Sequence, residues 1–135
     1  MSPILRGDPF NPEKSLIFER FVKFPGNLSK FDIHWDDVGK RYYSIVSRVW
    51  NQDRPTTRNL LSLISSEDLE YWELEYDLLD YTHMNAQQVG FQYVSFLFDK
   101  EDLLYLCRTA FNGAESYHDN NYITFHRVQN FRKKM

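Results

Sequence analysis

The chain has 135 residues and a mass of 16.3 kDa, which suits a single domain with a buried core. Its net charge of −3 argues against a general nucleic-acid binder, and its single cysteine, Cys107, excludes an internal disulfide framework and a cysteine-rich zinc site. No stretch approaches the ~20 apolar residues that span a bilayer, and the N-terminal MSPILRGDPF lacks the apolar core of a signal peptide. We therefore expect a soluble chain of unknown location that binds neither nucleic acid nor membrane.

The first part of the chain predicts an irregular lead-in followed by a series of strands. Proline and glycine interrupt residues 1–15, so this lead-in is expected to be irregular. Alternating apolar residues and β-branched or aromatic runs then predict strands at 15–24, 30–36, 41–50, 59–66 and 72–81. We take residues 16–81 as a first structural unit and residues 82–89 as a linker with room for one helical turn.

A second unit, residues 90–135, repeats this pattern. It predicts strands at 90–99, 102–111 and 121–128, with a polar loop at 112–120. The tail 129–135 is expected to form a short last strand, and its basic run, residues 132–134, to be solvated. Cys107 lies within the apolar DLLYLC, so we expect a core residue rather than a nucleophile.

The two units resemble each other. Trp35-Asp36 and Phe98-Asp99 each end a strand, and Arg48 and Arg108 each end the next strand at nearly the same spacing. Strand-turn-strand-loop-strand units at fixed spacing are typical of propeller blades. A β-sandwich would also place strands at these intervals, so both folds remain open from the spacing alone.

The stretch SSEDLEYW, residues 65–72, predicts a structured turn between two strands. Ser66 and the Asp68 carboxylate can accept bonds from nearby backbone N–H groups, and Trp72 can pack between neighbouring sheets. The motif resembles a shortened Asp-box, a turn that recurs in sialidase-like propellers. It differs in having Glu70 at the glycine position and the tryptophan one residue early, and it is structural in that family.

Three stretches together resemble the C-terminal portion of bacterial sialidase-like, glycoside-hydrolase-type β-propeller proteins. They are FPGNLSKFDIHWD (24–36), RPTTRNLLSLISSEDLEYW (54–72) and residues 90–132, of which RTAFNGA, HD and NYITFHR are the most specific part. The resemblance implies an all-β fold of antiparallel four-stranded blades in a partial propeller. Because members of the family have five or six blades and this chain has little more than two, it implies either a fragment or self-association.

The segment RTAFNGAESYHDNNYITFHR, residues 108–127, holds more polar side chains than a turn requires. Arg108, Asn112, Glu115, His118 and Asp119 fall within twelve positions. Loops at one end of a propeller gather round its axis, where ligands bind. The alternative is a structural loop that caps its own strand ends, with His118 and Asp119 bonded to each other.

The resemblance implies roles in acidic-sugar hydrolysis for several residues. Arginine grips a carboxylate in bidentate fashion, and hydrolysis needs an acid and a nucleophile. The candidate catalytic residues are Asp119 and Glu115 as acid and Tyr93, or Tyr122, as nucleophile. The candidate substrate-binding residues are Arg108, Arg58, Asn112, His118 and Lys30, with Asp32 beside Lys30 and Arg6 as a distant third arginine. No metal-ligand spacing or phosphate loop is present, so no metal or cofactor is expected.

Three functions are compatible with these residues. The first is a sialidase-like glycoside hydrolase or a fragment of one. The second is a non-catalytic carbohydrate-binding module, and the third is a structural propeller segment. Only Arg58 and Arg108, with Arg6 a distant third, are candidates for the three arginines of a sialidase, which favours a partial site over a working one.

Overall fold

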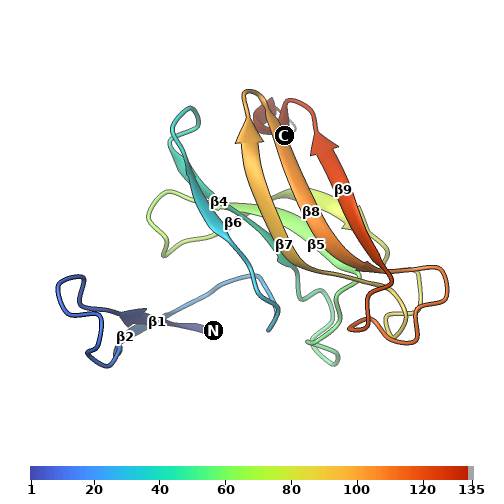
Figure 1. Ribbon diagram of the computed structural model, residues 1–135, viewed down its shortest axis with the longest axis horizontal. Coiled ribbons are helices and arrows are strands. Elements are labelled where there is room, and N and C mark those ends of the chain that lie inside the picture. Colours follow the sequence, from blue (N-terminus) through green and yellow to red (C-terminus); the bar gives the residue numbers. More distant parts are fainter. Residues whose placement is uncertain (134–135) are drawn as a thin grey trace.

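The computed structural model describes residues 1–133, and this part of the chain is all-β (Figure 1). It contains three antiparallel sheets and one short 3-10 helix. The strands are β1 (Ser2–Arg6), β2 (Ile17–Val22), β3 (Ile33–Asp36), β4 (Arg41–Ser47), β5 (Leu60–Ser66), β6 (Glu73–Asp80), β7 (Gly90–Asp99), β8 (Asp102–Ala110) and β9 (Tyr122–Val128), and the helix is η1 (Phe131–Lys133).

Strands adjacent in sequence pair with each other in every sheet. β3-β4-β5-β6 form a four-stranded sheet, β7-β8-β9 a three-stranded sheet and β1-β2 a separate hairpin. All eight strands predicted from 15–24 to 121–128 are present, because short turns join runs whose side chains alternate between two environments. The sheets do not close into a ring within residues 1–133.

Two predictions at the ends of the chain are wrong. Ser2–Arg6 is a strand, β1, that pairs with β2, so the lead-in 1–15 is not irregular throughout. Pro3 is tolerated because both strands of a hairpin have a free edge that needs no N–H donor. Residues 82–89 are a linker, as predicted, and consist of turns. The expected last strand is the helix η1, while Lys134 and Met135 lie outside the described residues.

The core lies between the four-stranded and the three-stranded sheet. Tyr43, Ile45, Leu61 and Leu63 of the first sheet face the second. The second sheet contributes Phe91, Phe96, Leu103, Tyr105 and Cys107. Cys107 is only 1% exposed and its burial raises the pKa of the thiol to about 11, which suits the core role predicted for it.

The turn after β5 has the hydrogen bonds that SSEDLEYW predicts. Asp68 Oδ1 accepts the N–H groups of Glu70 (2.8 Å) and Tyr71 (2.9 Å), and Ser66 Oγ accepts that of Leu69 (2.8 Å). Trp72 differs from its prediction. It is half-buried against Phe24, with ring centroids 5.2 Å apart, rather than wedged between two sheets.

Arg132, predicted as part of a solvated tail, instead forms a buried ion pair with Asp36 at the end of β3. Arg132 Nε and Nη2 donate to the two carboxylate oxygens at 2.6 and 2.7 Å, and the side chains are 12% and 3% exposed. Asp36 Oδ2 also accepts the Gly39 N–H, where a Cβ on Gly39 would lie 2.7 Å from that oxygen. Burial alone would raise the pKa of Asp36, but Arg132 and the Gly39 N–H more than offset it, and the pKa is lowered.

Candidate functional site

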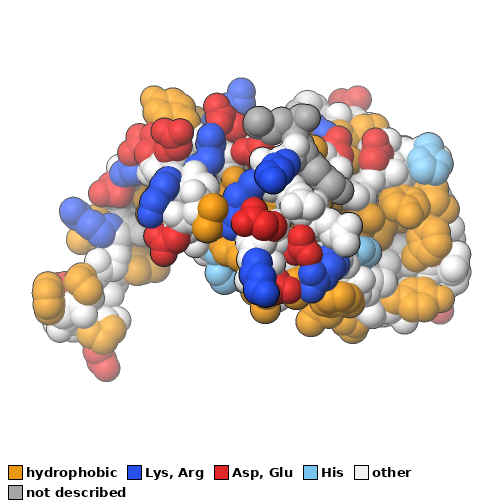
Figure 2. Space-filling view, turned by 90° about the horizontal axis from the view of Figure 1, so that it is seen from above, with side chains coloured by type: hydrophobic (Ala, Val, Ile, Leu, Met, Phe, Trp, Pro, Cys, Tyr) orange, Lys and Arg blue, Asp and Glu red, His pale blue; other side chains and the backbone are white. Residues whose placement is uncertain are grey.

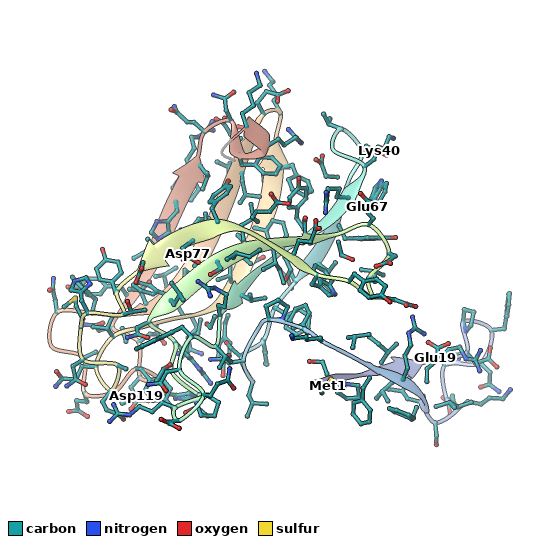
Figure 3. All side chains as sticks on the ribbon, turned by 180° about the vertical axis from the view of Figure 1, so that it is seen from behind. Met1, Glu19, Lys40, Glu67, Asp77 and Asp119 are labelled. Atoms are coloured by element: carbon teal, nitrogen blue, oxygen red, sulfur yellow. The ribbon has the colours of Figure 1, made fainter. Side chains whose placement is uncertain are left out.

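The polar loops of both larger sheets lie at the same end of the molecule. The loop between β4 and β5, the loop between β8 and β9 and the start of β7 meet there (Figure 1). The Phe91 N–H donates to the Arg58 carbonyl (2.8 Å) and the Tyr117 N–H to the Gln87 carbonyl (2.7 Å). A Cβ on Gly90 would lie 2.9 Å from the Tyr117 carbonyl oxygen, so the close approach of these segments requires glycine. In Figure 3, Asp119 lies at this end.

Three cationic side chains from separate segments surround the ring of Tyr93. Lys30 Nζ lies 5.5 Å, Arg58 Cζ 5.6 Å and Arg108 Cζ 4.9 Å from the ring centroid. The pairing of β7 with β8 is irregular between Gln92 and Ser95, and Tyr93 has a φ of 54° at this bulge. The bulge re-aims the side chain, as bulges do next to binding sites. We call Lys30, Arg58, Tyr93 and Arg108 the Tyr93 cluster.

The cations of the Tyr93 cluster have few partners of their own. Within residues 1–133, none of the three forms an ion pair with a carboxylate. Nε and Nη1 of Arg58 are buried and have no hydrogen-bond partner in this part of the chain. Arg108 donates from Nε to Asn120 Oδ1 at 2.6 Å. Apart from a longer-range attraction between Arg108 and Asp119, the three like charges repel one another, and an anion would relieve that repulsion.

Arg48, the counterpart of Arg108 in the first sheet, is in the opposite situation. Its Nη2 contacts both carboxylate oxygens of Asp77 at 2.9 and 3.0 Å, and its Nε donates to Ser62 Oγ at 3.1 Å. Arg48, just after β4, is therefore paired with a carboxylate, whereas Arg108, near the end of β8, forms no ion pair with a carboxylate within residues 1–133.

The loop between β8 and β9 is anchored by a buried amide. Gln92 is 1% exposed and donates from Nε2 to the His118 carbonyl at 2.8 Å, while its Oε1 is buried without a partner among the described residues. Asn121 bonds the backbone of Phe111 through both its Oδ1 (3.0 Å) and its Nδ2 (2.5 Å). These hydrogen bonds cap the strand ends, as expected if the loop is structural.

His118 and Asp119 form an exposed pair. His118 Nδ1 lies 3.3 Å from Asp119 Oδ1, and the Asp119 N–H donates to Ser116 Oγ at 3.1 Å. The hydrogen bonds from His118 and Ser116 lower the pKa of Asp119. A lowered pKa keeps the carboxyl ionised at neutral pH, which is opposite to the shift that a general acid needs.

The remaining candidates are not among the cations that lie over the ring of Tyr93 within residues 1–133. Asn112 is exposed with a φ of 50° and serves the turn after β8, and Glu115 is exposed in the same loop. Tyr122 is exposed at the start of β9, and Arg6 lies in β1 of the separate hairpin. The structure thus brings together Lys30, Arg58, Tyr93 and Arg108, whereas Asn112, Glu115, Tyr122 and Arg6 are not among the side chains that face that ring.

Sequence reasoning missed three residues that support the cluster. They are Tyr117, whose ring centroid lies 5.5 Å from Arg58 Cζ, together with Asn120 and Gln92. Asn120 stands in the same polar run as His118 and Asp119, which was a usable signal. Gln92 had no such signal in the sequence, because a single amide in an apolar strand indicates only that one position on one face is polar.

Two further features, a metal-binding cluster and a membrane-spanning helix, are absent from the described residues. Across residues 1–133, no group of three or more histidine, cysteine or acidic side chains is arranged to hold a metal ion. The same residues include no helix with the length and apolar character needed to cross a membrane.

Comparisons with protein-family models, with curated proteins and with solved structures find no match to this chain. The resemblance to sialidase-like propellers therefore rests on the sequence motifs alone. A proposal for the ligand of this chain is therefore based on the charges and hydrogen-bond donors of the Tyr93 cluster.

Proposed function

We propose that the Tyr93 cluster binds a sugar that carries a carboxylate. The observation that supports this most strongly is the convergence of Lys30, Arg58 and Arg108 on one aromatic ring without a carboxylate partner in the described chain. Guanidinium groups recognise planar carboxylates through paired N–H donors. Tyr93 supplies an aromatic face with a polar end, against which the apolar face of a sugar ring can pack.

We further propose that the two larger sheets are neighbouring blades of a partial sialidase-like propeller. Strand order 3-4-5-6 and 7-8-9, with every neighbour antiparallel, is the order of strands within a blade. The face-to-face core between the sheets and the Asp-box-like turn at Ser66 and Asp68 support the same reading. The three-stranded sheet lacks the counterpart of β6. A β-sandwich shares the packed faces but gives no reason for that turn.

Binding without turnover is the form of the proposal that the side chains favour. The two candidate acids, Asp119 and Glu115, are exposed, and the pKa of Asp119 is lowered. Glycoside hydrolysis instead needs a carboxylic acid that stays protonated next to the scissile bond. Sialidase-like hydrolysis is the second candidate, because Tyr93, the proposed nucleophile, is the ring on which the cations converge.

Titration calorimetry with N-acetylneuraminic acid and with glucuronic acid tests the proposal. The methyl ester of each sugar keeps its shape and removes the charge. We expect the acids to bind and the esters to bind at least tenfold more weakly, because a charge-assisted hydrogen bond contributes about 1.5–3 kcal/mol. Arg108→Ala and Arg58→Ala should each weaken binding about 10- to 100-fold by the same reasoning.

Arg48→Ala is the matched control. Arg48 is paired with Asp77, so this variant should lose stability and keep its affinity for the acid in the fraction that remains folded. Arg108→Ala should do the reverse. Equal binding of acids and esters, or unchanged affinity in Arg108→Ala, would refute the carboxylate site. If Arg108→Ala unfolds the protein, Arg108 stabilises the fold and the loop between β8 and β9 has a structural role instead of a binding role. Release of an aryl leaving group from a synthetic sialoside would establish the second candidate.

A further inference from the structure

The face of the β7-β8-β9 sheet that points away from the core is apolar and uncovered. Leu97, Leu106, Ile123 and Phe125 are each between 49% and 64% exposed. The strand register makes them neighbours, because Leu106 pairs with Phe125, and Leu97 pairs with the half-buried Leu104. A shallow groove runs between these side chains. We call Leu97, Leu104, Leu106, Ile123 and Phe125 the outer face.

The β1-β2 hairpin presents a second uncovered apolar surface. A bulge between Ile4 and Leu5 shifts the register, so that Phe18 and Phe21 lie on one side with ring centroids 5.0 Å apart. Leu5 pairs with Phe18, and all three side chains are between 49% and 58% exposed. Figure 2 shows the hairpin as a lobe that stands apart from the body, with hydrophobic side chains over much of its surface. We call Leu5, Phe18 and Phe21 the hairpin face.

The hairpin needs more support than its own chain gives it. An isolated two-stranded hairpin is at best marginally stable in water. Its contacts with the body include an ion pair between Arg20 and Glu70 (2.6 Å) and the burial of Val22, both away from the hairpin face. In Figure 1 the hairpin and β9 lie at opposite sides of the molecule, so the hairpin face cannot reach the outer face of the same chain.

The exposed area of the chain matches what an interface of standard size would cover. The accessible surface is 8688 Å². A compact monomer of this mass exposes about 7,500 Å², so the excess is on the order of 1,200 Å². A standard interface covers about 800 Å² on each partner. The excess exceeds the area that one partner contributes to a standard interface.

We propose that the hairpin face of one copy of this chain docks on the outer face of a second copy. Leu106 and Phe125 pair at the centre of the outer face, where Arg108 lies opposite Ile123 and Arg127 opposite Leu104 on either side of them. The hairpin face is likewise apolar, and both surfaces occur on every copy in equal number. The hairpin face and the outer face of one chain are too far apart to cover each other. Reciprocal exchange of hairpins between two copies forms the same contact twice and closes with two-fold symmetry.

Light scattering of the full chain over a concentration series provides the first test. We expect a mass of at least twice 16.3 kDa at about 100 µM, a concentration well above a dissociation constant of about 1 µM. A hairpin variant, F18D with F21D, and a sheet variant, L106K with F125K, should each be monomeric. Mixing the two variants should restore association, because the sheet variant keeps an intact hairpin face and the hairpin variant an intact outer face. Tyr71→Asp, at an exposed aromatic residue outside both faces, should associate as the wild type does.

A monomeric wild type would overturn the proposal and would favour cover of the outer face by another chain. Undiminished association of the hairpin variant would overturn it as well, in favour of outer faces stacked on each other. A mixture that stays monomeric would have the same consequence. Amide hydrogen exchange of the wild type needs no substitution. We expect residues 17–22 and 122–128 to gain protection together as concentration rises, and protection of one segment alone would refute the pairing.

Discussion

Replacing Arg132 with methionine should destabilise the protein by about 3 kcal/mol at neutral pH. The substitution removes the charge but keeps an apolar side chain against Phe131, whose ring centroid lies 4.4 Å from Arg132 Cζ. It leaves the Asp36 carboxylate buried at 3% exposure. Breaking a buried ion pair by removing one partner costs about 3–5 kcal/mol. We expect the lower end of that range, because Asp36 still accepts the N–H groups of Val38 and Gly39.

The sign of the pH dependence follows from the lowered pKa of Asp36. A group with a depressed folded-state pKa contributes stability that is present above its unfolded pKa and is lost as the pH falls through the folded pKa. The wild type should therefore lose this contribution below its unfolded value of 3.8. In Arg132→Met only the N–H groups of Val38 and Gly39 still oppose the effect of burial, so the buried carboxylate is less well stabilised and its protonation costs the variant less than it costs the wild type. The difference in stability between the two proteins should shrink on acidification.

Urea unfolding followed by tryptophan fluorescence, at pH 7 and at pH values down to about 3, measures both effects. Arg127→Met is the matched control. Arg127 also contacts two carboxylates, those of Asp99 and Asp102, but it is 44% exposed, and exposed pairs contribute at most about 1 kcal/mol. The reasoning fails if Arg132→Met loses less than about 1 kcal/mol, or if its deficit stays the same at low pH.

Two further substitution and labelling experiments test the packing. Trp72→Ala should cost about 2 kcal/mol in a urea melt, below the 3–5 kcal/mol of a fully buried aromatic, because Trp72 is half-buried against Phe24. A loss below about 0.5 kcal/mol would show that the ring contributes no packing. Cys107 should resist a thiol reagent at pH 8 in the native state and react after unfolding, because burial raises the pKa of its thiol to about 11. Rapid labelling of native protein would contradict its place in the core.

The strands were predictable because their signal is local. Alternation along 30–36 and 90–99 depends only on neighbouring residues, and both segments became strands of the two larger sheets. The strand β1 was missed because Pro3 is normally a strand breaker, and its tolerance on a free edge depends on the partner strand. The local sequence pattern therefore predicts where strands form better than it predicts which strands pair.

The candidate site was only partly predictable. Arg58 and Arg108 follow from their places in the repeated units, but the bulge that aims Tyr93 at them has no signature in the sequence. Arg132 was misread as solvated, because a basic run near a tail predicts a charged surface when its partner, Asp36, is remote in sequence. Charge pairing of this kind is decided by tertiary contacts.

The position of Phe131 has a consequence for the order in which the protein assembles. Its ring packs on Tyr43 of β4 and stacks on Phe98 of β7, and its carbonyl accepts a bond from Tyr76 of β6 at 3.0 Å. During synthesis, β3 to β6 leave the ribosome well before this residue does. The four-stranded sheet must therefore wait with part of its inner face open to solvent, and to chaperones, until residue 131 is made.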